Sequence, residues 1–411
     1  MKSIKIKDLN LNRYSVGFAL VCIYILMSYI AHDFLIPSVL LPISLYPFLL
    51  ISAYVFLRDF RKTRLTDFTK WYIVFIIFSA LILLYSPSIA GVFDTFYQLI
   101  VSFFVVSAVQ IYLRTEKNFL ALCWCYAISS GLLVFLLYIT GNLKGSESDR
   151  LGEALMGNAN NFAMIMMIAL MCCFWLLIHS AKKMRWKLLL VAIILADLYA
   201  LSLSGGRKFL VVPFIFLYLV LWFKRDKNGK RQIFLYTVIF AIVVIVAGYL
   251  IMKVPVLYNA IGVRMEKLFQ FFIGNGGDNS SMIREEMRIL AFSEWLDRPF
   301  WGYGFDSFKY LAQEELGQFY YSHCNYTELL YCGGIFYFLV FYWQYFKIAY
   351  RSIADNLLPD KYKAFSFGAV ISLFIFDYGA VSYNLTPYMI LLMMAFSALR
   401  FRQTEKTENK E

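Results

Sequence analysis

The chain has 411 residues, of which 61% are hydrophobic and 16% are charged, and its mean hydropathy is +0.63. A soluble domain has about a quarter of its residues charged and fewer than half apolar, so the composition excludes an ordinary soluble protein. The formal net charge of +12 would suit a nucleic-acid-binding protein, but the positions of the charges, given below, exclude that class.

Apolar runs of about twenty residues recur along the whole chain, and each is long enough to cross a hydrocarbon core of about 30 Å. They predict an all-α fold, a polytopic membrane helix bundle of about twelve transmembrane helices. The predicted spans are residues 16–31, 35–57, 71–86, 96–113, 119–140, 161–178, 188–204, 209–223, 232–252, 329–346, 364–379 and 384–399. The first run lacks a small-residue cleavage site and is typical of a signal anchor, not of a cleavable signal peptide.

Basic residues are distributed unequally between the connections. If the N-terminus is inside, 28 of the 39 Lys and Arg residues fall in inner segments, namely residues 2–13, 58–70, 114–117, 182–187, 224–231, 347–363 and 400–410. This bias agrees with the number of spans and predicts that both termini are cytoplasmic. The positive charge is therefore an orientation signal, and we expect a lipid bilayer and no nucleic acid as the partner.

The spans divide the chain into four parts. Residues 1–252 hold the first nine transmembrane helices, residues 253–328 form a large loop domain on the outer face, residues 329–400 hold the last three helices, and residues 401–411 form a charged tail predicted to be disordered. Within the loop, GNGGDNSS at 274–281 predicts a flexible turn. A helix follows, with an apolar stripe at Met287, Leu290, Ala291 and Trp295, and Pro299 ends it.

The seven cysteines fit neither a disulfide nor a metal framework. Cys123 and Cys125 are two residues apart, which places them on different faces of a helix. No carboxylate cluster with the grouping of metal ligands occurs on the outer side, so the sequence predicts no metal site and no cofactor.

Two pairs of cations on the outer side oppose the charge bias. Arg207 and Lys208 lie in the short turn SLSGGRKF, where they either extend to the membrane interface or bind an anion, as the adjacent glycines and the guanidinium donors would suit. Arg284 and Arg288 are one helical turn apart and either bind a polyanion or pair with Glu285.

Polar residues at the start of the tenth predicted span form a third candidate site. His323 in the segment YYSHCNYTELL is one of three histidines, and it is either structural or a proton acceptor, since its pKa is close to the working pH. Asn325 and Glu328 would share one face if this stretch is already helical.

Four other polar residues near or within the spans are candidates. Arg150 is a further candidate phosphate contact, and Asn160 at the mouth of the sixth span is either an N-cap or a substrate contact. Asp197, inside the seventh span, is a functional candidate because buried charges are costly, whereas Asp377 is expected near the surface.

The order of these pieces resembles that of the O-antigen ligase/polymerase superfamily of bacterial surface-polysaccharide enzymes. The likeness rests on four segments between residues 157 and 340: GNANNFA, LSLSGGRKFLV, IREEMRILAFSEWLDRPFWGYGFDSF and SHCNYTELLYCGGI. The last two resemble the family's helix followed by Pro-x-x-Gly-x-Gly and its Ser-His-Asn-Asn-x-x-Glu-Leu-Leu pattern. Cys324 departs from that pattern by replacing the first Asn.

The resemblance implies glycosyl transfer from an undecaprenyl-pyrophosphate-linked glycan at the outer face of the cytoplasmic (inner) membrane. By match of position, Arg207, Arg284 and His323 are the implied catalytic residues, with Arg288, Arg150, Asn160, Asn325 and Glu328 binding substrate. The arginines would neutralise the leaving pyrophosphate and His323 would deprotonate the attacking hydroxyl. A chain-length regulator protein is a further implied partner.

The sequence leaves three functions open. The preferred one is polymerisation of lipid-linked oligosaccharide repeat units, for O-antigen or a related surface polysaccharide, because the SHxNYxELL form without a second nearby His is more similar to the polymerases. The alternative is an O-antigen ligase that transfers the chain to lipopolysaccharide core. A polysaccharide flippase or secondary transporter is an alternative of another class, supported by Asp197 alone.

Overall fold

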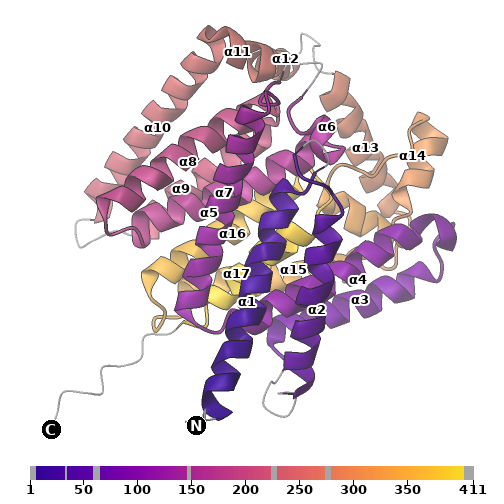
Figure 1. The fold of residues 1–411 in the computed structure, drawn as a ribbon. Coiled ribbons are helices and arrows are strands. Elements are labelled where there is room, and N and C mark those ends of the chain that lie inside the picture. The colour runs from indigo at the N-terminus through magenta and orange to yellow at the C-terminus, as the bar shows by residue number, and fades with distance from the viewer. Residues whose placement is uncertain are drawn as a thin grey trace.

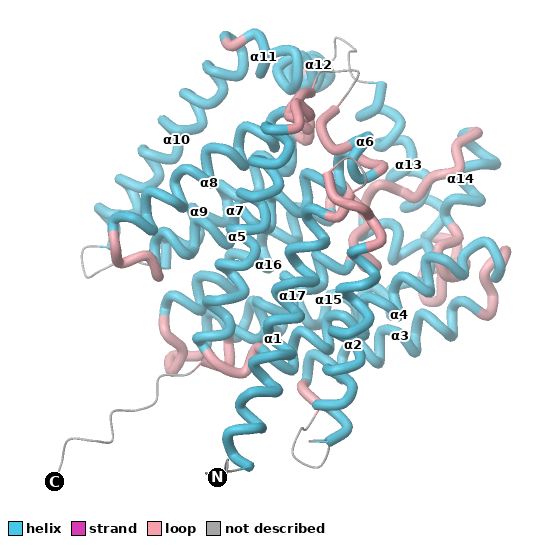
Figure 2. Tube along the Cα trace, in the orientation of Figure 1, coloured by secondary structure: helices cyan, strands magenta, loops and turns pink. Residues whose placement is uncertain are grey.

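The computed structural model describes residues 6–32, 35–58, 65–145, 150–223, 229–273 and 279–401. Within these residues all regular secondary structure is helical, as Figure 2 shows, which confirms the predicted all-α class. The predicted tail from residue 402 and most of the predicted turn at 274–281 lie outside the described residues.

The helices follow one another through short connections. In chain order they are α1 (Ile6–Ile30), α2 (Leu40–Arg58), α3 (Asp67–Leu83), α4 (Ile89–Tyr112), α5 (Glu116–Ile139), α6 (Glu153–Met156), α7 (Ala159–His179), α8 (Met184–Leu203), α9 (Arg207–Phe223), α10 (Gly229–Lys253), α11 (Pro255–Leu257), η1 (Tyr258–Gly262), α12 (Val263–Phe272), α13 (Asn279–Trp295), α14 (Phe308–Leu316), α15 (Asn325–Ala354), α16 (Asp360–Asp377) and α17 (Thr386–Ala398).

Twelve of these helices overlap the twelve predicted spans: α1 to α5, α7 to α10 and α15 to α17. Within the described residues, six of them, α2, α4, α5, α7, α8 and α15, are long and apolar enough to cross a membrane. Shorter apolar helices occupy Tyr14–Ile30 and Thr386–Ala398. The chain is therefore a multi-pass membrane protein by length and composition of its helices, while the full count of twelve spans remains a prediction.

Helix α7 forms the centre of the bundle. It packs against α5, α8 and α9, and 83% of the residues in its most apolar 18-residue stretch are buried. Near its end, the ring of Trp175 contacts Phe119 of α5 and Tyr362 and Phe365 of α16, with ring centroids 5.4 to 6.0 Å apart. Helix α16 in turn packs against α9, α15 and α17, so the two halves of the chain share one hydrophobic core.

The two ends of the bundle differ in structure. α1 begins at the lower end in Figure 1, where ion pairs join distant segments: Lys347 to Asp67 at 2.9 Å and Lys361 to Glu116 at 2.5 Å. Helices α11 to α14, from the predicted loop, lie at the opposite end (Figure 1). This arrangement is the one expected if the lower end is cytoplasmic, which itself stays a prediction.

The helices of the predicted loop domain pack directly on the bundle. Met287 and Ala291 of α13 are fully buried in a second cluster with α14 and the start of α15, and Leu290 packs against that cluster. The predicted apolar stripe of this helix is thus the buried face, and α13 ends at Trp295, before Pro299. After α14, helix α15 begins at Asn325, four residues before the predicted span.

Candidate functional site

The turn between α14 and α15 holds His323 in an unusual conformation. Its φ is +58°, a left-handed value that costs a non-glycine residue about 1 kcal/mol or more. The buried carboxylate of Glu328 accepts a 2.8 Å hydrogen bond from the Ser322 N–H, and the Ser322 hydroxyl donates to the Cys324 carbonyl at 2.9 Å. The first turn of α15 therefore holds the backbone on both sides of His323.

The imidazole of His323 lies in a positive, half-buried environment beside Tyr321, with ring centroids 4.6 Å apart. Burial lowers the pKa of His323 from 6.5 to about 3, and the charges of Arg284, Lys208 and Arg288 contribute to this shift. The ring is consequently neutral at pH 7 and has a nitrogen that can accept a proton.

Six cationic side chains form one group of neighbouring charges within the described part of the chain, and three of them act on His323. They come from the loop before α7, from α9, from α12 and from α13: Arg150, Arg207, Lys208, Arg264, Arg284 and Arg288. Arg284 is close to both His323 and Arg150, because its charge contributes to the pKa shift of each. Such a concentration of positive charge in a partly buried place favours an anionic ligand.

Arg207 connects α9 to α12 and α13. One of its terminal nitrogens, Nη1, donates to the Arg264 carbonyl at 2.6 Å, and Nη2 donates to the Ser281 hydroxyl at 3.3 Å. Arg207 therefore ties α12 and the first turn of α13 to α9. Its charge also acts on Arg150.

Lys208 and Arg288 are held by the segment between α16 and α17. The Lys208 ammonium donates to the Gly379 carbonyl and lies 4.4 Å from the ring centroid of Phe376. The Arg288 guanidinium lies 4.6 Å from the ring centroid of Tyr378 and pairs with Glu285. The intrahelical pair considered for Arg288 is thus present, together with a cation–π contact.

Arg150 fixes the loop before α7. Its Nε donates to the Ser204 carbonyl at 2.7 Å and its Nη2 to Oδ1 of Asn160 at 3.1 Å. Burial and repulsion from the neighbouring arginines lower the pKa of Arg150 to about 10. The N-cap of α7 is Asn158, whose side chain accepts from the Asn160 N–H, so the N-cap interpretation of Asn160 was wrong by two residues.

A buried polar network lies behind the turn. Asn325 accepts hydrogen bonds from the N–H groups of Ser382 and Tyr383 and donates to the Tyr342 hydroxyl at 3.0 Å. The Tyr342 hydroxyl in turn donates to Asp377, which also accepts from Tyr388. Asp377 is fully buried, so the expectation that it lies at the surface was wrong: three hydroxyl donors compensate its burial.

The Pro-x-x-Gly-x-Gly segment is inserted into a break in α15. Gly334 has φ +71° and interrupts the helix, which leaves backbone groups on both sides without their helical partners. Residues 299–304 supply replacements: Ile335 N–H donates to Pro299 O at 2.8 Å, Tyr303 N–H to Tyr331 O at 2.9 Å, and Gly304 N–H to Cys332 O at 2.8 Å. Residues 299–304 therefore satisfy backbone groups that the break in α15 leaves without helical partners.

Two glycines permit this close approach. A Cβ on Gly334 would lie 2.2 Å from the carbonyl carbon of Phe300, and a Cβ on Gly302 would lie 2.3 Å from the carbonyl oxygen of Tyr331. Both also have φ above +60°, which side chains disfavour. The glycines of this motif thus have a structural reason.

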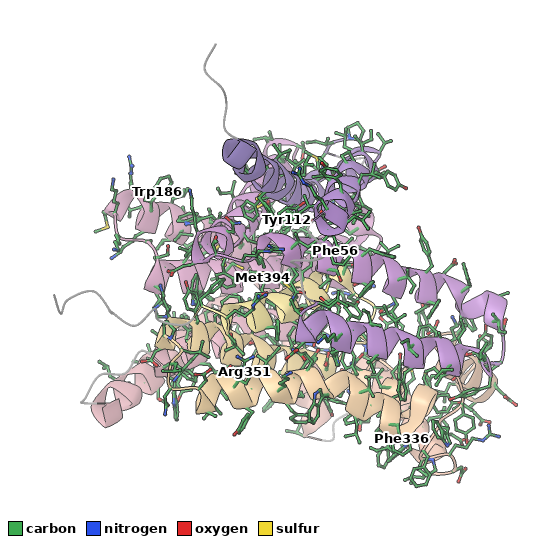
Figure 3. The ribbon with its side chains drawn as sticks, turned by 90° about the horizontal axis from the view of Figure 1, so that it is seen from below. Phe56, Tyr112, Trp186, Phe336, Arg351 and Met394 are labelled. Atoms are coloured by element: carbon green, nitrogen blue, oxygen red, sulfur yellow. The ribbon has the colours of Figure 1, made fainter. Side chains whose placement is uncertain are left out.

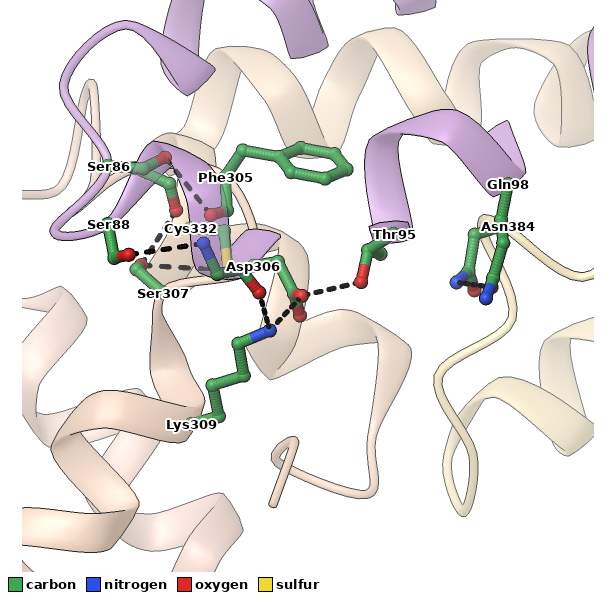
Figure 4. A network of polar contacts seen from close by, with 12 residues as sticks. Ser86, Ser88, Thr95, Gln98, Phe305, Asp306, Ser307, Lys309, Cys332 and Asn384 are labelled. Atoms are coloured by element: carbon green, nitrogen blue, oxygen red, sulfur yellow. Dashed lines mark hydrogen bonds and ion pairs between the residues drawn. The ribbon is translucent and has the colours of Figure 1, made fainter. Parts of the chain in front are cut away.

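The same segment is fixed to α4 on its other side, as Figure 4 shows. The Asp306 carboxylate accepts from the Thr95 hydroxyl and from the Lys309 ammonium, both at 2.7 Å, and Lys309 also donates to the Gly91 carbonyl at 3.0 Å. Ser86 donates to the Phe305 carbonyl at 3.1 Å. Because these partners belong to the α3–α4 hairpin, the helix bearing Arg284 is anchored beyond its C-terminal end.

The structure therefore brings together most of the residues predicted from the sequence. The charges of Arg284 and Arg288 act on His323. Arg150, which bonds Asn160, is acted on by the charges of Arg284 and Arg207. Asn325 and Glu328 are buried behind the turn, where their side chains bond the protein itself. Sequence reasoning named Lys208 beside Arg207 as a candidate anion contact but left Arg264 out of the site, although Arg264 opposes the charge bias of the outer side as Arg207 does.

Asp197 lies apart from this cluster. It is fully buried in α8 and accepts a 2.7 Å hydrogen bond from the Ser130 hydroxyl of α5. Among the described residues, no group of three or more His, Cys, Asp or Glu side chains could hold a metal ion.

Comparison with known families gives one match. A family model described as O-antigen ligase matches residues 192–342, a segment that contains Arg207, Arg284 and His323 and leaves Arg150 and Asn160 outside. No curated protein was found to match the chain. Residues 192–342, less than half of the chain, are thus similar to the O-antigen ligase family, which supports the resemblance to the O-antigen ligase/polymerase superfamily.

Proposed function

We propose that the protein polymerises lipid-linked oligosaccharide repeat units, of O-antigen or a related surface polysaccharide, by glycosyl transfer from an undecaprenyl-pyrophosphate donor. The observation that supports this most directly is the position of His323, which is half-buried in a left-handed turn, close enough to Arg284 and its neighbouring cations for their charges to lower its pKa. A base beside an anion site is what glycosyl transfer from a pyrophosphate requires.

In the proposed reaction, a hydroxyl oxygen of the acceptor sugar attacks the anomeric carbon of the donor glycan. The bond from that carbon to the pyrophosphate oxygen breaks, and undecaprenyl pyrophosphate leaves with the electron pair. Arg284 and Arg207 neutralise the charge that develops on the leaving group. His323 takes the proton of the attacking hydroxyl.

Donor binding would also tune the base. In the free protein, Arg284, Lys208 and Arg288 disfavour the protonated form of His323. A pyrophosphate bound among these cations would cancel part of their field and raise the pKa of the imidazole toward its ordinary value. The base would therefore gain proton affinity when the donor is in place.

A test is to replace His323 and Arg284 singly by Ala in cells that make the polysaccharide. We expect both variants to remain in the membrane and to lose long-chain polymer, because one loses the base and the other the nearest cation. Arg298→Ala is the matched control for Arg284, because Arg298 is exposed and its side chain contacts only the Tyr303 ring among the side-chain contacts described. Normal chain length in both site variants would overturn the assignment of roles.

The second candidate function is ligation of the finished chain to lipopolysaccharide core, which the description of the matching family as O-antigen ligase favours. In a Gram-negative host, a deletion strain separates the two. Core carrying a single repeat unit identifies a polymerase, whereas bare core with long chains left on the lipid carrier identifies a ligase. Accumulation of substrate on the inner leaflet would instead identify a transporter.

A further inference from the structure

A cavity of about 1090 Å³ opens between α2, α3 and α4. It lies at the end of the bundle where α4 and α17 end, next to Arg114 and Arg400, and opposite to the His323 turn. Figure 3 views the molecule from this end and labels Phe56, one of the residues that line the cavity. The volume is slightly above the usual range for small-molecule sites, about 300 to 1,000 Å³.

The cavity is open toward the surroundings of the bundle. Several apolar side chains of its wall are exposed: Leu50 is 70% exposed, Tyr46 63% and Phe104 55%. These residues lie within α2 and α4, two of the helices apolar enough to cross a membrane, so their exposed faces contact acyl chains. A ligand can therefore reach the cavity sideways from the bilayer.

The length of the cavity matches one leaflet. Its wall on α2 extends from Tyr46 to Phe56. At 1.5 Å per residue this is about 15 Å along the helix axis, which is half of a hydrocarbon core of about 30 Å. An acyl chain of the adjacent leaflet would fill this length.

The end of the cavity is positively charged. Arg114 and Arg400 both line it, and no acidic residue occurs among its described lining residues. Arg114 also lies 5.2 Å from the ring centroid of Tyr14, which orients its guanidinium. Partial burial and the charge of Arg114 lower the pKa of Arg400, as expected for two cations that share one place. This end is complementary to an anionic headgroup.

A buried donor lies beside the two arginines. Gln110 is only 5% exposed, and its Oε1 accepts from the hydroxyls of Thr66 and Thr69 at 2.8 and 2.7 Å. Its Nε2 has no hydrogen-bond partner within the described residues. An unsatisfied buried donor is costly, and Gln110 lines the cavity, so a ligand with an acceptor oxygen would compensate it.

We propose that this cavity binds an anionic glycerophospholipid from the leaflet at the basic end of the bundle. The phosphate lies between Arg114 and Arg400, an ester carbonyl accepts from Gln110, and an acyl chain lies along α2 and α4. The proposal is independent of the glycosyl transfer proposed above, which takes place at the other end of the bundle.

The test uses the purified full-length protein, stripped of lipid in mild detergent and titrated with phosphatidylglycerol or phosphatidylcholine while bound lipid is counted by native mass spectrometry. We expect phosphatidylglycerol to bind at least about tenfold more tightly, because charge-assisted hydrogen bonds to its phosphate are not opposed by a choline cation. The double variant Arg114→Gln/Arg400→Gln should lose this preference. Lys182→Gln/Arg185→Gln, which removes two exposed cations outside the cavity, should keep it.

Two single variants keep the test decisive if the double variant does not fold. Ala53→Trp fills the wall of the cavity and should reduce binding of both lipids, and Gln110→Leu removes the buried donor and should weaken phosphatidylglycerol binding about fivefold or more. Equal affinity for the two lipids, or binding unchanged in all these variants, would overturn the proposal. Displacement of phosphatidylglycerol by equimolar undecaprenyl phosphate would assign the cavity to a polyprenyl lipid and overturn it as well.

Discussion

The carboxylate of Glu328 accepts the backbone N–H of Ser322 at 2.8 Å, so the residue before His323 is bonded to the helix that follows it. Both partners are fully buried. Because the carboxylate of Glu328 is buried and bonds this backbone N–H, Glu328 can affect substrate only through the residue that it positions. Glu328, predicted from the sequence to bind substrate, is thus placed to hold His323 in its left-handed conformation.

Replacing Glu328 separates positioning from stability. We expect Glu328→Ala to leave the Ser322 N–H unsatisfied, to lower the free energy of unfolding by about 1 to 3 kcal/mol and to reduce polymer length. Glu328→Gln retains an acceptor oxygen and should preserve most of both. The measurements are thermal midpoints in detergent and gel profiles of the polysaccharide; equal loss in both variants would mean that the charge, not the hydrogen bond, matters.

The lowered pKa of His323 predicts a dependence of stability on pH. Its pKa is about 3 in the folded protein, below the value of 6.5 expected when unfolded, so the unfolded chain binds the extra proton between these values. The free energy of unfolding should therefore fall below about pH 6.5, by up to about 1.4 kcal/mol per pH unit from this group. Thermal midpoints measured across this range should fall less steeply in His323→Gln; parallel curves would contradict the shift.

The break in α15 predicts a sharp contrast between two glycines. Gly334→Ala should prevent assembly of the outer segment, because the new Cβ would lie 2.2 Å from backbone atoms of Phe300. Gly317 has nearly the same φ, +67°, with nothing within 4 Å of an added Cβ, so Gly317→Ala should cost only about 1 kcal/mol. Membrane abundance and limited proteolysis compare the two, and similar behaviour would show that the close contact is not essential.

Two ion pairs provide a test of the anchor on α4. The Asp306–Lys309 pair is mostly buried, with 11% and 14% of its side chains exposed, and Asp306 also bonds Thr95. Asp306→Ala should lower the free energy of unfolding by about 3 kcal/mol, since it leaves a buried cation. Asp67→Ala breaks the more exposed pair with Lys347 and should cost about 1 kcal/mol or less. The thermal midpoints should differ accordingly.

The bundle could be predicted closely from the sequence, because apolar runs and the charge bias are local signals. The site could be predicted in part: Arg284 and His323 stand in motifs, whereas Arg264 stands in none and is joined to Arg207 through a hydrogen bond to its carbonyl. Asp377 was misjudged because its three hydroxyl partners come from other segments. Pairings of this kind depend on the packing of distant helices, which periodicity and composition do not encode.

The insertion of residues 299–304 into the break of α15 has a consequence for catalysis. Arg284 precedes this segment on α13, and His323 precedes the half-helix into which it is inserted. Because backbone hydrogen bonds join residues 299–304 to α15, the segment that follows Arg284 cannot shift without carrying the helix that follows His323. The proposed base and its neighbouring cation form a single preorganised unit, so the cost of arranging them is met when the protein folds and not again with each donor that binds.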